Sequence, residues 1–378
     1  MRDVKGEMRL AVVIPYLNVI NGNKPPIRFV NKLSAEGVEI DLVVHTMRRE
    51  LRNYLENSIG QTNLIVLKAT DHSPNKITSF FKSEFSHKYA IDLSYEIKKR
   101  HSEKRYDFII QYGNEGRDLA LEIKKWKSVT PPKIGLVVME LVDHVFLRNG
   151  NEGFSVSRTL LFPFYKLVHH FEYMKFKAYD SLLSISTWTS ILLMYFYGLR
   201  SESEFIFYDE TEFFVNHSIN KENYIIVPTA SLSIKYRETV SKLYKDGINL
   251  ITYGNLEVSG VPHLGYLPEE EMKTRISRAR ALLFLFDYEA FGLIPLESLA
   301  LGTPVITIPK DGPFIYLKDN KCTYFVNNYS EILEKCKDVS NEAWLDKNPV
   351  NLCNESVSNF RLSIYIKKFT EYLENILD

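Results

Sequence analysis

The clearest candidates for functional residues in this sequence are two glutamates eight residues apart, Glu289 and Glu297. They stand in the stretch 281–308, which opens and closes with an apolar run. Such runs are typical of strands that are buried on both faces of a parallel sheet. Between them, Pro295 suits the start of a helix and Gly302 suits the position just after its end. The sequence therefore predicts a strand, a loop that carries Glu289, a helix that carries Glu297 in its first turns, and a second strand.

Both carboxylates fall beyond the carboxyl end of the first predicted strand, where open α/β sheets bind their ligands. A carboxylate can accept two hydrogen bonds from a vicinal diol, and hydrogen bonds to a charged group are the strong ones. The amide groups that open the helix favour an anion such as a phosphate. The competing interpretation is a surface glutamate, Glu297, that only matches the helix dipole. The embedding in a strand, loop and helix favours the functional interpretation over that one.

The segment EAFGLIPLESLALGTPV resembles the E-x7-E signature of retaining nucleotide-sugar glycosyltransferases of family 4, which have the two-domain GT-B fold. The resemblance implies that Glu297 holds the ribose hydroxyls of the donor and that Glu289 faces its sugar. It also places Phe291, Gly292 and Leu293 at the donor. The backbone amides of Gly292, Leu293 and Ile294 would open the helix towards the diphosphate. The donor is a substrate, so the resemblance implies no cofactor and no metal.

The same family has an arginine and a lysine that cradle the diphosphate and stabilise the charge on the leaving group. Lys235 fills the lysine position, whereas Ala230 or a neighbour stands where the arginine is expected. Arg237 is a candidate to compensate if the loop is bent. Further along, Lys310 adds a cation near the phosphates, and Ile315 replaces a glutamate of the family pattern.

Four loop residues complete the candidate site by resemblance. Gly265 and Tyr266 would lie beside the nucleobase, and Gly22 would lie in the loop after the first strand, near acceptor and donor phosphate. In the family a histidine near the end of a later strand contacts the donor sugar. Glu140 stands at that position and His144 is the alternative, although a surface histidine without such a role remains the competing interpretation.

Length and composition limit the classes of protein to consider. A chain of 378 residues predicts two domains, because single cores stop growing before that size. Lys and Arg number 47, as do Asp and Glu, so no net charge favours nucleic acid as partner. Three cysteines without metal-ligand spacing indicate neither a disulfide framework nor a zinc site. The short apolar run at the start predicts a strand rather than a signal peptide, and no run is long enough to span a membrane. We therefore expect a cytoplasmic protein.

Strand and helix patterns alternate along the chain, which indicates parallel sheets. We expect two doubly wound, Rossmann-like domains that face each other across a cleft. Residues 1–208 would form the acceptor domain and residues 209–355 the nucleotide-sugar domain. An amphipathic helix within 356–378 would cross back to the first domain, as the GT-B resemblance implies.

The resemblance implies a retaining transfer of a hexose-type sugar to an acceptor hydroxyl on a glycan, lipid or small molecule. A GT-B protein that binds a glycan or nucleotide sugar without catalysis is the alternative, and a nucleotide-sugar epimerase is a third. Segment 162–177 interleaves aromatic and basic residues. This pattern predicts either the flank of a core helix or a helix at a membrane surface, so peripheral membrane contact is a possible partner interaction.

Overall fold

The computed structural model describes residues 8–17, 24–60, 62–70, 82–113, 115–139, 141, 156–230, 232–341, 343–344 and 349–377. Within these ranges, the side chains of 82–86, 156–165, 168, 203 and 349 are outside the description. The chain forms two compact units: the first unit is Met1–Phe205 with Tyr365–Asp378, and the second unit is Ile206–Ile364.

The first unit contains a seven-stranded parallel sheet with the strand order β3-β2-β1-β4-β5-β6-β7. Its elements are β1 (Arg9–Leu17), α1 (Lys24–Ala35), β2 (Glu39–Arg48), α2 (Arg52–Ser58), β3 (Asn63–Thr70), α3 (Lys82–Glu103), β4 (Phe108–Tyr112), α4 (Leu119–Lys124), β5 (Lys133–Val138), α6 (Val156–Ala178), β6 (Ser181–Ser184), α7 (Thr187–Tyr197), β7 (Ser203–Glu204) and most of α14 (Leu362–Leu377).

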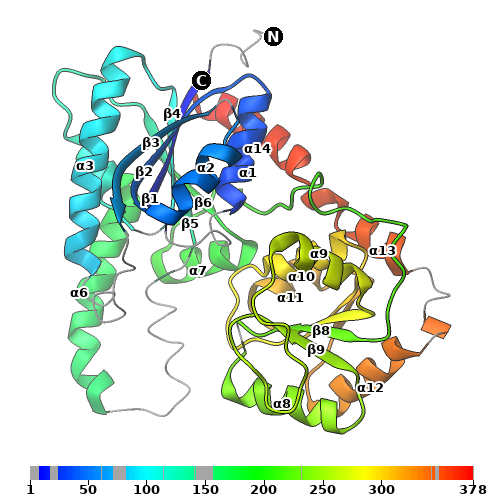
Figure 1. Ribbon diagram of the computed structural model, residues 1–378. Helices are drawn as coiled ribbons and strands as arrows, with labels where there is room; N and C mark the ends of the chain where they lie inside the picture. The colour runs from blue at the N-terminus through cyan, green and yellow to red at the C-terminus, as the bar shows by residue number, and fades with distance from the viewer. Residues whose placement is uncertain are drawn as a thin grey trace. The chain divides into compact units, whose positions relative to one another are not determined.

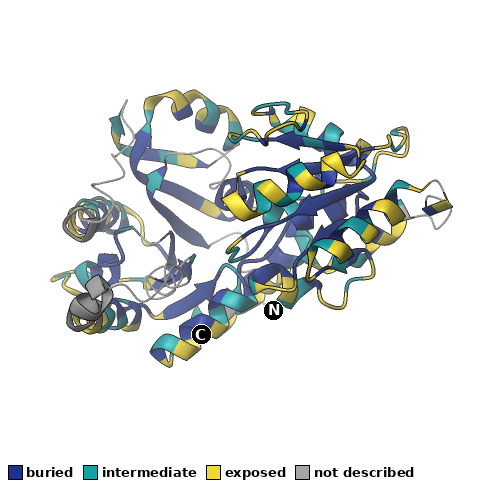
Figure 2. Ribbon diagram, turned by 90° about the horizontal axis from the view of Figure 1, so that it is seen from below, coloured by how far each residue is buried: buried dark blue, intermediate teal, exposed yellow. Residues whose placement is uncertain are grey.

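Helices cover both faces of this sheet (Figure 1). On one face, Phe29 of α1 lies 5.0 Å from Phe369 of α14, measured between ring centroids, so the C-terminal helix packs on the first unit. On the other face, α3, α4, α6 and α7 share one hydrophobic cluster. The central strands are buried along almost their whole length, which explains their continuous apolar sequences (Figure 2).

The second unit contains a five-stranded parallel sheet with the order β12-β11-β10-β8-β9. Figure 1 shows α9, α10 and α11 on one face of it and α8 and α12 on the other. Its elements are β8 (Ile225–Pro228), α8 (Ile234–Lys245), β9 (Leu250–Tyr253), α9 (Glu269–Arg278), β10 (Ala281–Phe284), α10 (Leu293–Ala300), β11 (Val305–Thr307), α11 (Asp311–Leu317), β12 (Thr323–Phe325), α12 (Tyr329–Ser340) and α13 (Pro349–Ser356), with short 3-10 turns at Arg49–Leu51 in the first unit and Ser358–Phe360 here.

The predicted strand–loop–helix–strand unit is present as β10, the loop 285–292, α10 and β11. Gly302 follows the helix with φ 78°, the left-handed conformation that a helix end of this kind requires. One element begins earlier than expected. Two adjacent prolines after a turn-rich stretch predict a loop, but Pro25 and Pro26 lie in the first turn of α1. Backbone N–H groups in the first turn of a helix have no acceptor within the helix. Proline, which lacks this group, therefore costs the helix little at these positions.

Candidate functional site

The order of strands in the second unit determines where its ligand site should lie. β10 pairs with β8, although β9 follows β8 in the chain and lies on the opposite side of it. The sheet therefore grows in opposite directions from β8 and β10, and doubly wound folds bind ligands at the carboxyl ends of such a pair. The loops at this point are 229–233 after β8 and 285–292 after β10. The second of these loops carries Glu289.

Glu289 organises its own loop through backbone contacts. One carboxylate oxygen, Oε1, accepts hydrogen bonds from the amides of Gly292 at 3.0 Å and Phe291 at 3.3 Å. The Gly292 amide, which was expected to face a diphosphate, is therefore occupied by Glu289 in this structure. The next two amides, those of Leu293 and Ile294, open α10 and have no acceptor among the described residues. They are the amides available for an anion.

Two glycines allow this loop to pack against α11. Gly292 has φ 82°, and a Cβ atom there would lie 2.8 Å from Pro313. At Gly312, a Cβ atom would lie 2.1 Å from the carbonyl oxygen of Ala290, and the Gly312 amide donates to the Glu289 carbonyl at 3.0 Å. Backbone thus meets backbone at Gly312, which leaves no room for any side chain.

Glu297 is a buried residue, with 8% of its surface exposed, which is at odds with the competing interpretation of a surface glutamate that only matches the helix dipole. It lies near two tyrosine hydroxyls, those of Tyr253 at the end of β9 and Tyr316 in α11. Burial raises the pKa of both hydroxyls, and the negative charge of Glu297 raises both further. Tyr316 donates to the Gly292 carbonyl at 2.6 Å, whereas the buried Tyr253 hydroxyl has no partner among the described residues. Both phenols therefore remain neutral donors at physiological pH.

A further contact links the predicted nucleobase loop to these groups. The Gly254 amide, next to Tyr253, donates to the Gly265 carbonyl at 2.8 Å. Gly265 adopts φ 70°, and the Tyr266 side chain that follows is 70% exposed. Neighbouring contacts thus connect seven residues, which we call the donor-end network: Gly265, Gly254, Tyr253, Glu297, Tyr316, Gly292 and Glu289.

Three cations were predicted near a diphosphate. Lys310 donates to the Asp287 carbonyl, so it lies directly beside the loop that carries Glu289. Lys235 is exposed in the first turn of α8, with its Nζ atom 5.4 Å from the centroid of the Tyr236 ring. Burial raises the pKa of Tyr236, and the charge of Asp287 raises it further. Arg237 has a buried Nε atom without a hydrogen-bond partner among the described residues. Lys310 and the start of α8 therefore both lie near Asp287, which belongs to the loop that carries Glu289.

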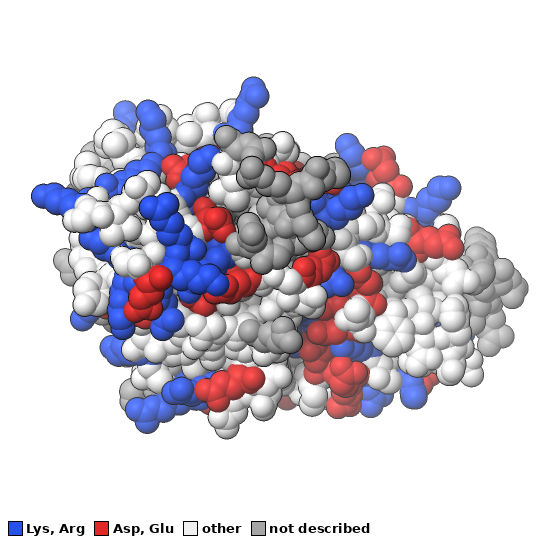
Figure 3. All heavy atoms as spheres, turned by 90° about the horizontal axis from the view of Figure 1, so that it is seen from above, with Lys and Arg blue, Asp and Glu red and all other residues white. Residues whose placement is uncertain are grey.

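Two predicted site residues, Gly22 and His144, lie outside the described residues, as does Glu140. Within the described part of the chain, no group of three His, Cys, Asp or Glu side chains could hold a metal ion. All three cysteines are buried free thiols. On the face drawn in Figure 3, Lys and Arg side chains are interspersed with Asp and Glu side chains, as the balanced composition leads one to expect.

The sequence analysis did not single out Tyr253, Tyr316 or Asp311 as site residues. Tyr253 ends a buried strand at the edge where ligands bind, which is a signal that the sequence offered. Asp311 adopts φ 52°, an uncommon value for a residue with a side chain, and its carboxylate faces the Glu289 amide at 3.4 Å. Tyr316 gave no signal, because its role depends on how α11 packs against the Glu289 loop.

Comparison with known proteins finds one family match, in the second unit. Residues 255–351 match the family described as "Glycosyl transferases group 1", and this range contains most of the donor-end network. No protein with a curated description matches the chain in sequence.

Similar solved structures cover nearly the whole chain at low identity. Sucrose-phosphate synthase from Thermosynechococcus elongatus has a TM-score of 0.73 at 11% identity, covering 98% of this chain and 99% of that one. A glycosyltransferase from Rickettsia africae has a TM-score of 0.66 at 13% identity, with coverages of 98% and 99%. HepE from Anabaena, solved in complex with UDP and glucose, has a TM-score of 0.64 at 11% identity, with coverages of 98% and 100%. The chain therefore has the GT-B glycosyltransferase fold, and its second unit carries the region that matches group 1 glycosyl transferases.

Proposed function

We propose that this protein is a retaining glycosyltransferase that moves a hexose-type sugar from a nucleotide diphosphate sugar to an acceptor hydroxyl. The observation that carries the proposal is the donor-end network. It places a buried carboxylate, a capped loop and two free helix amides at the carboxyl ends of β8 and β10. The match to group 1 glycosyl transferases over the same residues supports it.

Each part of a nucleotide sugar has a complementary group in this network. Glu297 accepts hydrogen bonds from the ribose diol, and charged acceptors make the strongest such bonds. Tyr253 offers a buried hydroxyl without a partner among the described residues, next to that carboxylate. The amides of Leu293 and Ile294 bind the diphosphate at the start of α10. Gly265 and Tyr266 border the base, and Glu289 faces the sugar.

The transfer step requires stabilisation of the charge that grows on the departing diphosphate. Lys235 supplies this stabilisation. Ala230 stands where the family has an arginine, and Arg237 and Lys310 are the candidates to take over the role of that arginine. The leaving diphosphate takes the proton of the attacking hydroxyl on the same face of the sugar, which gives retention. This route needs no pair of protein carboxylates at the sugar, in contrast to retaining glycosidases. It also needs no metal if the lysine and the helix amides neutralise the phosphates.

A specific observation favours the alternative, a GT-B protein that binds a glycan or nucleotide sugar without catalysis. Ala230 and Ile315 stand where the resembling family has an arginine and a glutamate, and both changes remove charge. In such a protein Glu297 would still hold a nucleotide, but no product would form.

Transfer from radiolabelled nucleotide sugars separates the two functions. UDP-glucose is the first donor to test, because the HepE structure holds UDP and glucose. Transfer or donor hydrolysis, with retained configuration in the product, would support the transferase. Tight donor binding without any turnover across a panel of donors and acceptors would contradict it and favour the binding protein.

The acceptor is a glycan, a lipid-linked sugar or a small molecule, and helix α6 bears on the choice. No helix in the described part of the chain is long and apolar enough to cross a membrane. In α6, Phe176 is fully buried in the core, whereas Leu167, Phe171 and Met174 form an exposed apolar stripe, with Phe171 56% exposed. Among the described side chains of segment 162–177, one side is thus a core flank, and the exposed side is the candidate for peripheral membrane contact.

Co-sedimentation with anionic vesicles tests that contact. Exposed lysines such as Lys166 should each add about 1 kcal/mol of attraction, which salt should weaken. Replacement of Phe171 by Ser should reduce binding at both salt concentrations. If the unaltered protein does not sediment with vesicles at low salt, the acceptor is not reached through α6.

A further inference from the structure

The edge strands of the two sheets differ in length. Among the described strands, the edges are β3 and β7 in the first unit and β12 and β9 in the second. β7 has two residues, β12 has three and β9 has four, whereas β3 has eight. Proteins commonly keep edge strands short, because an unpaired edge presents amide and carbonyl groups to any other strand. The β3 edge is therefore the one that this molecule leaves long.

The β3 edge is also apolar. Its centre, Leu64–Leu67, reads Leu-Ile-Val-Leu, and Lys68 is the single charged residue of the strand. Leu64, Val66 and Leu67 are half-buried, whereas the neighbouring strand β2 is buried along nearly its whole length. Half-buried apolar side chains on an edge strand gain burial when a further strand pairs with it.

A hollow with a volume of about 470 Å³ borders this edge. Helix α2 lies on the same face of the sheet as α1, because Asn31 of α1 donates to the Ser58 carbonyl of α2, and α3 lies on the opposite face. A strand that enters the hollow can therefore reach the β3 backbone between two helices. The lining residues are Leu64–Leu67 of β3, Arg52 and Glu56 of α2, and Glu96 and Arg100 of α3.

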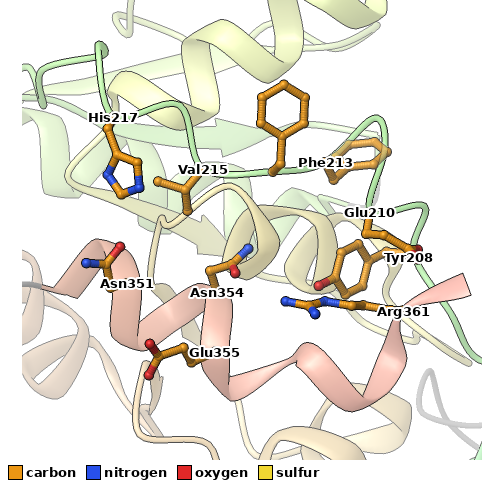
Figure 4. A pocket seen from close by; sticks show the side chains of 10 residues that line it. Tyr208, Glu210, Phe213, Val215, His217, Asn351, Asn354, Glu355 and Arg361 are labelled. Atoms are coloured by element: carbon orange, nitrogen blue, oxygen red, sulfur yellow. The ribbon is translucent and has the colours of Figure 1, made fainter. Parts of the chain in front are cut away.

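The hollow in Figure 4, between the segment 208–217 and α13, differs because its own side chains pair with each other or with the backbone. Tyr208 forms a side-chain hydrogen bond with Arg361, and Glu210 accepts from the Ser363 amide at 3.2 Å. The outer edge of β3, in contrast, pairs with no strand in the part of the chain that the structure describes.

The charged residues of the β3 hollow form two ion pairs, each within one helix. Arg52 Nε lies 2.8 Å from Glu56 Oε1 on α2, and Arg100 Nε lies 2.7 Å from Glu96 Oε1 on α3. The four charges cancel, so the hollow favours neither a basic nor an acidic peptide. Along each helix, one charge is followed by its opposite one turn later, and this order is complementary to the same helix running in the opposite direction.

A second copy of the chain provides that opposite direction. Antiparallel pairing of β3 with β3 of another copy is generated by a twofold axis perpendicular to the sheet. This axis keeps each face of the sheet on its own side, so α2 meets α2 and α3 meets α3. Arg52 then faces Glu56 of the partner subunit. On the other face of the sheet, Glu96 faces Arg100 of the partner subunit.

We propose that two copies of this chain associate through antiparallel pairing of their β3 edges, which joins the two seven-stranded sheets into one continuous sheet. The apolar centre of β3 becomes buried between the copies, and the charges of α2 and α3 align the two strands. The inference goes beyond the proposed transfer reaction, because no residue of β3, α2 or α3 belongs to the donor-end network.

Sedimentation equilibrium of the whole chain over a concentration series tests the proposal, and we expect a dimer at micromolar concentrations. Arg52→Glu places like charges opposite each other at both symmetry-related contacts, and we expect it to weaken the dimer about tenfold. The double variant Arg52→Glu with Glu56→Arg exchanges the two charges and should restore the dimer. Both side chains are about half exposed, so these variants should fold. Lys337→Glu, at an exposed position of α12, is the matched control.

Hydrogen exchange gives an independent readout of where the copies meet. Amides of β3 should exchange more slowly as the protein concentration rises, whereas those of the edge strands β9 and β12 should not change. UDP binding should be the same in Arg52→Glu as in the unaltered protein, so this proposal and the transfer reaction are tested separately. A monomer at every concentration would overturn the proposal, and so would a dimer that Arg52→Glu leaves intact, one that the charge exchange fails to restore, or one that protects amides outside β3.

Discussion

The two units use polar side chains at the carboxyl ends of their strands in different ways. In the first unit, Gln111 near the end of β4 is fully buried, and its amide group donates to the Glu115 carbonyl at 2.8 Å. Its carbonyl oxygen accepts from the Tyr179 hydroxyl at 2.7 Å. In the second unit, Tyr253 at the end of β9 is buried with a hydroxyl that no described residue satisfies, next to the buried Glu297. The Gln111 side chain thus stabilises the fold of the first unit, whereas the Tyr253 hydroxyl of the second unit remains available for a ligand.

Gly312→Ala should have the largest effect on the second unit. The new Cβ would meet the Ala290 carbonyl oxygen at 2.1 Å, and neither backbone segment can turn aside as a side chain could. We expect the loop 285–292 to shift, a loss of about 3 kcal/mol in the free energy of unfolding, and no measurable nucleotide binding. Denaturant unfolding and UDP titration by calorimetry measure both.

Gly260→Ala serves as the control for that change. Its Cβ would meet nothing within 4 Å, so only the strain of φ 77° remains. Equal losses of UDP binding in the two variants would mean that the close approach at Gly312 does not shape the donor site.

Lys235→Ala should come next. Charge on the diphosphate grows towards the transition state, so this lysine should contribute more to kcat than to KM. We expect kcat to fall about 100-fold, as for the loss of one donor that stabilises such charge. Lys245→Ala, in the last turn of the same helix, is the control. The assignment of Lys235 would be wrong if Lys235→Ala kept full activity. Loss of activity in Lys310→Ala would then assign the diphosphate to Lys310, and loss in Arg237→Ala would assign it to Arg237.

Glu297→Gln keeps the shape of a buried side chain and removes its charge. We expect nucleotide affinity to fall by about 1.5–3 kcal/mol, the range for hydrogen bonds to a charged group. Calorimetry with UDP measures it, and the exposed Glu238→Gln is the control. The outcome that would reject the assignment is unchanged affinity in a folded Glu297→Gln protein.

A matched pair of tyrosine changes tests the comparison between the units directly, with the smallest expected effect. Tyr179→Phe should cost about 1 kcal/mol of stability, because its hydroxyl has partners in Gln111 and Arg117. Tyr253→Phe should cost none, or stabilise, and should weaken nucleotide binding instead. The distinction between the units would be wrong if both changes destabilised the protein equally.

Local patterns in the sequence predicted much of the second unit. The apolar runs at β10 and β11, the glycine after α10 and the position of Glu289 in the loop are all consequences of neighbouring residues, and the structure has them as predicted. Pro25 and Pro26 show the limit of such patterns. Proline indicates a loop or a first helical turn equally well, and only the helix that follows decides between them.

By itself, the sequence determined the alternation of strands and helices, because hydrophobic periodicity reports which faces each element buries. It also brought Glu289 and Glu297 to one strand end. Only the tertiary structure decided what each carboxylate contacts. Glu297 is buried beside Tyr253 and Tyr316. The hydrogen bond from the Gly292 amide to the Glu289 carboxylate depends on the loop conformation, which the Gly312 amide stabilises by donating to the Glu289 carbonyl. These partners come from different strands and helices, and no local pattern specifies a contact between segments that meet only when the sheet has formed.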